Sequence, residues 1–147
     1  DKYHKKDEIP IITEDTIKHL DIKLTTNLED DCMFNGVQGE ISQVILNLIN
    51  NARDILAKNK NKEKLINISS YKKDDKIKIK VSDNGGGIPK KILPKIFDLY
   101  FTTKHQAQGT GIGLYMSKRI IENHHNGKLI GLNKNDGASF EITLPAI

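Results

Sequence analysis

The sequence predicts an α+β domain in which one sheet is covered on one face by helices. One segment, from Glu40 to Ala57, repeats apolar residues at the spacing of a helix. Two pairs of β-rich segments are each joined by a short polar run, a pattern typical of hairpins. The 147 residues are enough for one domain with one core.

The N-terminal part contains the weakest signals. Residues 1–21 are mixed and weakly periodic, and we interpret them as a linker or the tail of an upstream region, with the domain over residues 22–147. Residues Ile22 to Thr26 alternate apolar and polar side chains, which predicts a half-buried strand. Met33 and Phe34 predict a second short strand that ends at the following Asn-Gly pair.

The strongest periodic segment runs from Glu40 to Ala57. Its apolar residues recur at spacings of three and four, which predicts an amphipathic helix. These residues are Ile41, Val44, Ile45, Leu48, Ala52, Ile55 and Leu56. Two strands are expected next, at Leu65–Tyr71 and Lys76–Val81, and the polar pair Asp74-Asp75 between them predicts an antiparallel hairpin.

The segment from Ser82 to Gly113 is rich in the chain-breaking residues glycine and proline. It contains six of the eleven glycines together with Pro89 and Pro94. We therefore expect a long loop, with a short helix from Leu93 to Phe97.

The C-terminal part predicts another helix and a second hairpin. The helix spans Leu114 to Asn123. The residues expected on its apolar side are Met116, Ile120 and Ile121. Strands follow at Lys128–Leu132 and Ser139–Leu144, and the turn-rich residues 133–137 join them.

Composition excludes several classes of protein. No run approaches the roughly 18 to 20 apolar residues of a membrane span, so no direct membrane contact is expected, and we place the chain in the cytoplasm. The single cysteine, Cys32, excludes an internal disulfide and a multi-cysteine zinc site. Arg53 and Arg119 are the only arginines among 23 basic residues, and tryptophan is absent, which argues against nucleic-acid binding.

The first chemical signal is a polar stripe on the predicted helix of residues 40–57. Asn47 and Asn51 are four residues apart, and Gln43 and Asp54 fall on the same stripe. Amide oxygens are hard ligands that suit magnesium when it keeps several waters and bridges phosphates. A polar helix flank in an asparagine-rich protein is the alternative, and the stripe alone favours it.

The second signal is the run from Asp83 to Pro89, directly after a predicted strand. A carboxylate at a strand end can accept a hydrogen bond from an exocyclic amine, and glycines allow a flat ligand close to the backbone. A tight turn explains the run equally well. The third signal is the run from Gly109 to Leu114, which opens a helix where amide groups can meet phosphates. It matches neither a Walker loop nor the dinucleotide-binding pattern.

Together, in this order and spacing, these signals are specific. The chain resembles the catalytic, ATP-binding domain of sensor histidine kinases, in the GHKL superfamily shared with gyrase, Hsp90 and MutL. Residues Gln43 to Ala52 are similar to the family's N box, and Phe97 to Lys104 to the phenylalanine box of the nitrogen-regulator-like subgroup. Residues Gly137 to Phe140 resemble a late Gly-Thr-x-Phe strand signature. The resemblance implies a two-layer α/β sandwich of the GHKL (Bergerat) type, with a mixed sheet covered on one face by helices.

The resemblance also implies roles for individual residues. Asn47 and Asn51 would hold the magnesium ion and adjacent phosphates, and Lys104 would reach the terminal phosphates. Asp83 would read the adenine amino group. The other residues it assigns to the nucleotide are Asp54, Gly85, Gly87, Ile88, Phe97, Thr103, Gly109, Thr110, Gly111, Ile112, Gly113 and Leu114. Two positions depart from the family: Leu99 replaces a proline, and Val37-Gln38 replaces the polar-proline pair before the N-box helix, so we expect a different helix cap.

The function implied is that of a two-component histidine kinase domain, which binds Mg²⁺ and ATP beneath a mobile lid at about residues 88–108. It would donate the γ-phosphate to a histidine on a separate dimerisation domain of the parent chain, with a response regulator downstream. No phosphoacceptor helix is present, and His125-Asn126-Gly127 resembles a structural His-Gly-Gly turn. A GHKL-type ATPase or anti-sigma serine kinase is the alternative, but those relatives carry a glutamate where this chain has Asn47, whose amide cannot accept a proton.

Overall fold

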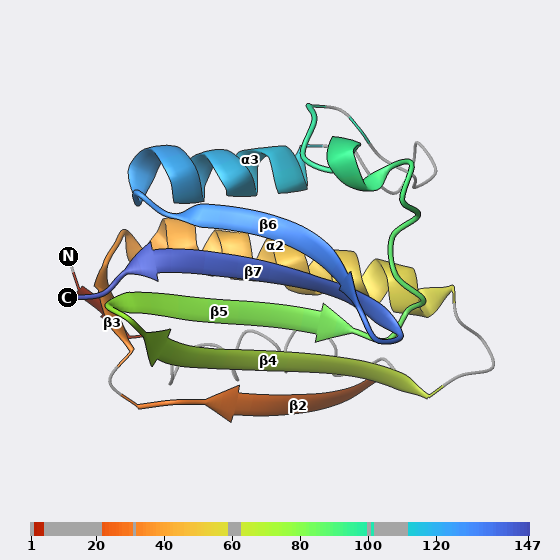
Figure 1. Cartoon of the computed structure of the whole chain (residues 1–147), viewed down its shortest axis with the longest axis horizontal. Coiled ribbons are helices and arrows are strands. Elements are labelled where there is room, and N and C mark those ends of the chain that lie inside the picture. Colours follow the sequence, from red (N-terminus) through yellow and green to blue (C-terminus); the bar gives the residue numbers. More distant parts are fainter. Residues whose placement is uncertain (1, 5–21, 31, 59–62, 100, 102–111) are drawn as a thin grey trace.

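The computed structural model describes residues 2–4, 22–30, 32–58, 63–99, 101 and 112–147. Its centre is a five-stranded sheet with the order β2-β4-β5-β7-β6 (Figure 1). The strands are β2 (Ile22–Leu28), β4 (Lys64–Lys73), β5 (Lys76–Asp83), β6 (Lys128–Lys134) and β7 (Gly137–Pro145). β2 runs parallel to β4 and all other pairs are antiparallel, so the predicted mixed sheet is confirmed.

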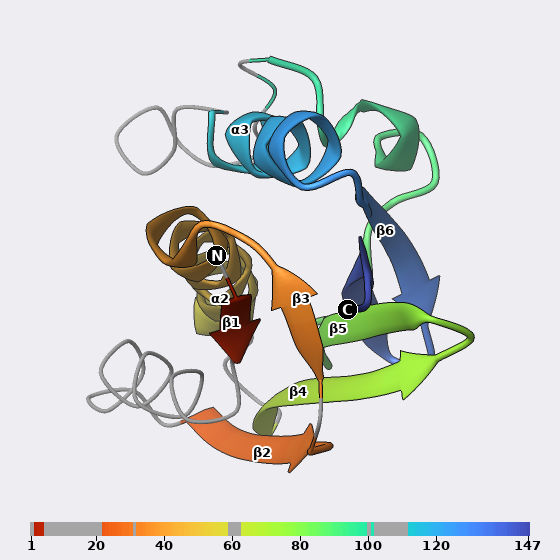
Figure 2. The same ribbon diagram turned by 90° about the vertical axis from the view of Figure 1, so that its left-hand side faces the viewer.

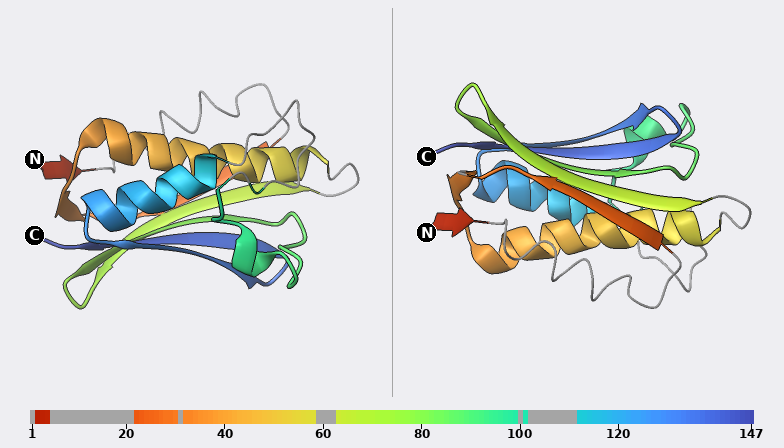
Figure 3. Two further views of the ribbon diagram at one scale, coloured as in Figure 1. Left: turned by 90° about the horizontal axis from the view of Figure 1, so that it is seen from above. Right: turned by 90° about the horizontal axis from the view of Figure 1, so that it is seen from below.

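Helices α2 (Gln38–Ala57) and α3 (Gly113–Arg119) lie on the same face of the sheet, as Figures 2 and 3 show. Apolar side chains of α2 pack against those of β4, β5 and β7 on the inner face of the sheet. Fully buried members of this core include Ile45, Leu48, Ile66, Ile79 and Ile142. The α+β architecture expected from the sequence is therefore confirmed. Among the described helices, none is both long and apolar enough to cross a membrane.

Both predicted hairpins form, and their turns are tight. Asp74 and Asp75 have φ angles of 50° and 63°, the left-handed values of a two-residue turn that matches the twist of the strands. In the second hairpin Lys134 pairs with Gly137, so only Asn135 and Asp136 form the turn. Both flanking strands are therefore longer than the alternation predicts.

The N-terminal segment that we interpret as a linker or tail contains a short strand. Residues Lys2–His4 form a short strand, β1, that pairs antiparallel with β3 (Met33–Asn35). Three residues are too few to show a period, so this long-range pairing leaves no local pattern. The other residues up to position 21 lie outside the described part of the chain, and the domain division remains a prediction.

Two helical elements also differ from the expectation. The short helix at Leu93–Phe97 is only a 3₁₀ turn, η1 (Leu93–Lys95). α3 continues into a π-helical turn, η2 (Ile120–His124), and Met116, expected on the apolar side, is 42% exposed. Ile121, expected on the same side, is buried, and Ile120 packs against the core. Ser117 is buried in place of Met116, and it has a polar partner on α2 that is described below.

The start of α2 is capped from a distant part of the chain. Val37 at the N-cap has no side chain able to bond the first turn, as the departure from the family pattern predicts. Its backbone N–H donates to Nε2 of the buried His125 at 3.1 Å, and Nδ1 of His125 donates to the Ile120 carbonyl at 3.0 Å. Nε2 thus accepts and Nδ1 donates, so the His-Asn-Gly turn is structural, as predicted.

Replacing His125 with phenylalanine should destabilise the domain by about 2 kcal/mol, because it leaves the donor and the acceptor of two part-buried hydrogen bonds unpaired. The neighbouring His124 provides the control. Its Nδ1 lies 3.3 Å from Glu40 Oε1 at the surface. Exposed pairs of this kind contribute at most about 1 kcal/mol, so His124→Gln should have a small effect. Urea unfolding of both variants measures the difference, and equal destabilisation would contradict the cap.

Candidate functional site

The polar stripe of α2 faces the start of α3. Gln43 Nε2 donates to Asn47 Oδ1 at 2.8 Å, as expected for side chains four residues apart. Asn47 Nδ2 donates to Ser117 Oγ at 3.1 Å and lies 3.5 Å from the Gly113 carbonyl oxygen. Helices α2 and α3 are therefore joined by the side chain of Asn47.

The stripe continues toward the C-terminal end of α2. Asn51 and Asp54 are both half-buried. Arg53 Nη2 lies 3.3 Å from Asp54 Oδ1, so the carboxylate has a cation beside it. The four polar residues predicted on one edge of the helix thus follow one another along it.

Asp83 is the last residue of β5, at the end of the sheet where β6 turns into β7 (Figure 1). Its Oδ1 accepts hydrogen bonds from the backbone N–H of Gly85 at 2.9 Å and of Ala138 at 3.4 Å. Burial raises the pKa of this carboxyl, and the two N–H donors oppose that rise. Among the described residues, none bonds the other oxygen, Oδ2.

The glycine turn after Asp83 presses against α2. A Cβ at Gly85 would overlap Cγ2 of Ile55, in the last turn of that helix. Gly86 and Gly87 have φ angles of 94° and 86°, which side chains rarely allow. Gly85 is therefore needed for the close approach to α2, and Gly86 and Gly87 are needed for the backbone conformation. The contact with α2 brings Asp83 near the C-terminal end of the polar stripe.

The β6–β7 hairpin supports Asp83 from behind. A Cβ at Gly137 would overlap the Asp83 carbonyl oxygen and lie 2.6 Å from its carbonyl carbon. Asn84 ties the same strand end to β4, because its side chain accepts from the Leu65 N–H at 2.9 Å and donates to the Glu63 carbonyl at 2.6 Å. Asp83 is thus held by backbone contacts on both sides.

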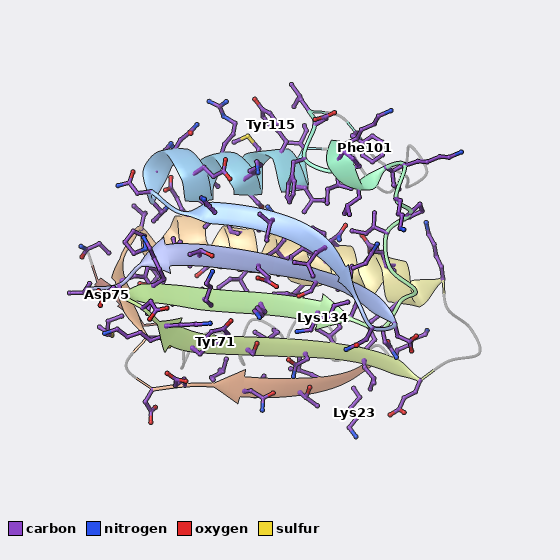
Figure 4. All side chains as sticks on the ribbon, viewed as in Figure 1. Lys23, Tyr71, Asp75, Phe101, Tyr115 and Lys134 are labelled. Atoms are coloured by element: carbon purple, nitrogen blue, oxygen red, sulfur yellow. The ribbon has the colours of Figure 1, made fainter. Side chains whose placement is uncertain are left out.

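Phe97, which the sequence assigns to the nucleotide, packs into the fold. Its ring meets that of Phe140 edge-on, with centroids 6.2 Å apart, and Lys118 Nζ lies 4.8 Å from its centroid. Figure 4 shows Phe101, after this segment, and Tyr115 of α3 on the same side of the molecule. Phe97 therefore anchors the beginning of the predicted phenylalanine box to β7 and α3.

Several predicted site residues lie outside the described part of the chain. These are Thr103, Lys104, Gly109, Thr110 and Gly111. Residues 100 and 102–108 of the expected lid also lie outside the described part, and the mobility of the lid remains a prediction. At the start of α3, Ile112 and Gly113 are exposed, whereas Leu114 packs against the core.

The structure adds contacts that we did not predict. Ser117, Asn133 and Ala138 each bond a predicted site residue. For the β6–β7 hairpin, the Gly137–Phe140 signature was the sequence feature that pointed to the site. The described residues contain no cluster of three or more His, Cys, Asp or Glu side chains able to hold a metal ion.

The fold and the order of these elements define an ATPase domain. A model of the family "Histidine kinase-, DNA gyrase B-, and HSP90-like ATPase" matches residues 36–147. The chain belongs to this family, as the sequence resemblance indicates.

The relatives found in sequence comparison are sensor kinases. The sensor protein FixL of Bradyrhizobium diazoefficiens is 38% identical over 107 residues, which cover 73% of this chain and 21% of that protein. Sporulation kinase A of Bacillus subtilis is 33% identical over 125 residues, 84% of this chain and 20% of the kinase. The histidine-protein kinase AtoS of Escherichia coli is 40% identical over 107 residues, 71% and 16% of the two chains. The chain thus spans about a fifth of the length of these relatives.

Solved structures show the same fold. The catalytic domain of histidine kinase ThkA superposes with a TM-score of 0.84 at 28% identity, over 99% of this chain and 96% of that one. A structure of ThkA in complex with the response regulator protein TrrA matches with a TM-score of 0.79 at 27% identity, over 100% of this chain and 42% of the kinase. The predicted two-layer GHKL fold is therefore confirmed.

Proposed function

We propose that this chain is the catalytic part of a two-component sensor histidine kinase. It binds ATP and Mg²⁺ and presents the γ-phosphate to a histidine on a separate dimerisation domain of its parent protein. One observation supports this reaction over ATP hydrolysis. Asn47 occupies the position at which the ATPase and serine kinase relatives carry a glutamate, and its neutral amide is bonded at both ends, by Gln43 and by Ser117.

Asp83 is suited to the adenine end of the nucleotide. Two backbone N–H groups hold its Oδ1, which leaves Oδ2 able to accept a hydrogen bond from an exocyclic amine. Gly85 and Gly87 allow the base close to the backbone beside it. The backbone contacts around Asp83 hold this acceptor in place before the ligand arrives, which lowers the cost of ordering on binding.

Asn47 and Asn51 are suited to the phosphate end. An amide oxygen has two lone pairs, so Asn47 Oδ1 can accept from Gln43 and still take part in a metal shell. Bound magnesium would neutralise phosphate charge, and phosphoryl transfer depends mainly on such neutralisation and on positioning. The resemblance adds Lys104 and the glycine-rich run from Gly109 to Gly113 to this end of the site.

The ATPase and serine kinase alternative requires a general base for water or a serine hydroxyl. A carboxylate at position 47 would supply it, but an amide has no basic lone pair at working pH. Asn47 accepts a hydrogen bond from Gln43 and donates one to Ser117, so its side chain orients these two neighbours. We therefore expect slow ATP hydrolysis by this chain.

The partners proposed follow from the same reaction. A histidine acceptor is required, and the dimerisation domain of the parent is its proposed source. The complex of ThkA with a response regulator supports a response regulator as the next acceptor. We propose that the reaction takes place in the cytoplasm, without nucleic acid and without membrane contact by this domain.

Incubation of the 147-residue chain with γ-labelled ATP tests the proposal. We expect ATP binding, little phosphate release and no label on the chain, because no segment of the sequence resembles the family's acceptor helix. Addition of the separately produced dimerisation domain should yield acid-labile phosphohistidine on that domain. Acid-labile label on the chain itself would overturn the proposal, and rapid phosphate release would favour the ATPase alternative.

A further inference from the structure

One side chain of the β6–β7 hairpin bonds both backbone groups of a residue in the glycine-rich loop. Oδ1 of Asn133 accepts from the Ile88 N–H at 2.6 Å, and Nδ2 of Asn133 donates to the Ile88 carbonyl at 2.7 Å. The two residues are 45 positions apart in the chain. Ile88 is therefore held at both ends by one planar amide.

Further contacts cross the same junction. The Gly86 N–H donates to the Asp136 carbonyl at 2.8 Å. A Cβ at Gly87 would lie 2.8 Å from Asn133 Oδ1, so the amide also packs closely on the turn. With the bond from Ala138 to Asp83, the hairpin contacts the loop near its beginning, in its middle and at Ile88. Figure 4 labels Lys134, the neighbour of Asn133, at this end of the sheet.

These contacts restrict the conformation of the turn formed by Gly85, Gly86 and Gly87. Glycine loses more conformational freedom on folding than any other residue, so a turn of three glycines samples many shapes unless its ends are held. Asp83 holds one end through its bond to Gly85. Asn133 holds the other end at Ile88, where the chain leaves the turn toward η1.

We propose that Asn133 is a positioning residue of the nucleotide site: its amide fixes the backbone of Ile88 and thereby holds the Gly85–Gly87 turn in the shape that receives the base beside Asp83. The inference rests on the proposed function of this site. Asparagine suits the position because one planar group offers a donor and an acceptor side by side. Without it, only part of the population would have the competent turn, and apparent affinity would fall by that fraction.

Two substitutions of Asn133 and one matched control test the proposal. Asn133→Ala removes both bonds to Ile88, and Asn133→Ser keeps a shorter polar group. Asn135→Gly removes an asparagine side chain from the same hairpin, at a φ of 56° that glycine adopts readily. Circular dichroism melting of each variant is the check that the domain remains folded.

The Kd for Mg-ATP, measured by calorimetry, is the first readout. We expect Asn133→Ala to raise it about tenfold, from the loss of two hydrogen bonds that hold the competent turn. Asn133→Ser should fall between alanine and wild type, and Asn135→Gly should match the wild type. In phosphotransfer to the separate acceptor domain, the KM for ATP should rise while kcat at saturating ATP stays unchanged.

Hydrogen exchange of the Ile88 amide, without nucleotide, is the second readout. In Asn133→Ala this amide should exchange about tenfold faster, while exchange in the core of α2 stays the same. Equal ATP affinity of Asn133→Ala and wild type would overturn the positioning role, and so would unchanged exchange at Ile88. Failure of the wild-type chain to bind ATP would overturn the proposed function instead, so the two failures are distinguishable.

Discussion

Asp83→Asn should weaken ATP binding by about 10- to 100-fold, equivalent to a loss of roughly 1.5 to 3 kcal/mol for a hydrogen bond to a charged acceptor. Asparagine has the same shape, and its Oδ1 can keep the bonds from Gly85 and Ala138. Its Nδ2 would replace Oδ2 and present a donor to the amino group of adenine. Calorimetric titration with Mg-ATP measures the loss, and unchanged affinity would refute the assignment of Asp83.

The same substitution should leave the nucleotide-free domain as stable as the wild type, or make it more stable, at neutral pH. Burial raises the pKa of Asp83 above its ordinary value of 3.8, so the folded state holds a proton here more tightly than the unfolded state. The contribution of Asp83 to stability is therefore greatest below pH 3.8 and declines as the pH rises through the raised pKa. The advantage of the Asp83→Asn variant over the wild type should accordingly shrink on acidification. Urea unfolding across this pH range is the measurement, and a large loss of stability at pH 7 would contradict it.

Gly137→Ala should have the largest effect on stability, a loss of about 3 kcal/mol or more. Its Cβ would overlap the carbonyl oxygen of Asp83, and backbone atoms cannot rotate away as a flexible side chain can. Either the β6–β7 hairpin or the end of β5 must shift. We therefore expect ATP affinity to fall together with the free energy of unfolding.

Gly39→Ala is the matched control for Gly137→Ala. Gly39 lies in the first turn of α2, and a Cβ there would meet no atom within 4 Å. Alanine favours the helix over glycine by about 0.5 to 1 kcal/mol, so this variant should be more stable than the wild type. Denaturant unfolding of both variants gives the comparison. Similar stabilities of the two variants would show that the space around Gly137 tolerates a Cβ atom.

Much of the site could be located from the sequence because its chemistry follows local patterns. Helical periodicity placed Asn47 and Asn51 on one stripe of a helix, and the hydrogen bond from Gln43 to Asn47 confirms that alignment. The position of Asp83 after a predicted strand placed a carboxylate at a strand end, as observed. Such patterns are visible because residues two to four positions apart share a face of their own helix or strand.

The sequence by itself therefore determined the main helices and strands, their order and the family, and it indicated the residues that we propose to carry the chemistry. The tertiary structure alone decided which distant residues hold them in place. The cap between Val37 and His125 joins residues 88 positions apart, and the bonds of Asn133 to Ile88 and Ala138 to Asp83 span 45 and 55 positions. The burial of Ser117 on α3, in place of Met116, likewise involves a distant partner, because Asn47 of α2 bonds Ser117. In the sequence, His125, Asn133 and Ser117 cannot be told apart from polar residues that face solvent or form turns. A hydrogen bond between distant segments depends on how the whole chain packs, so local patterns do not reveal it.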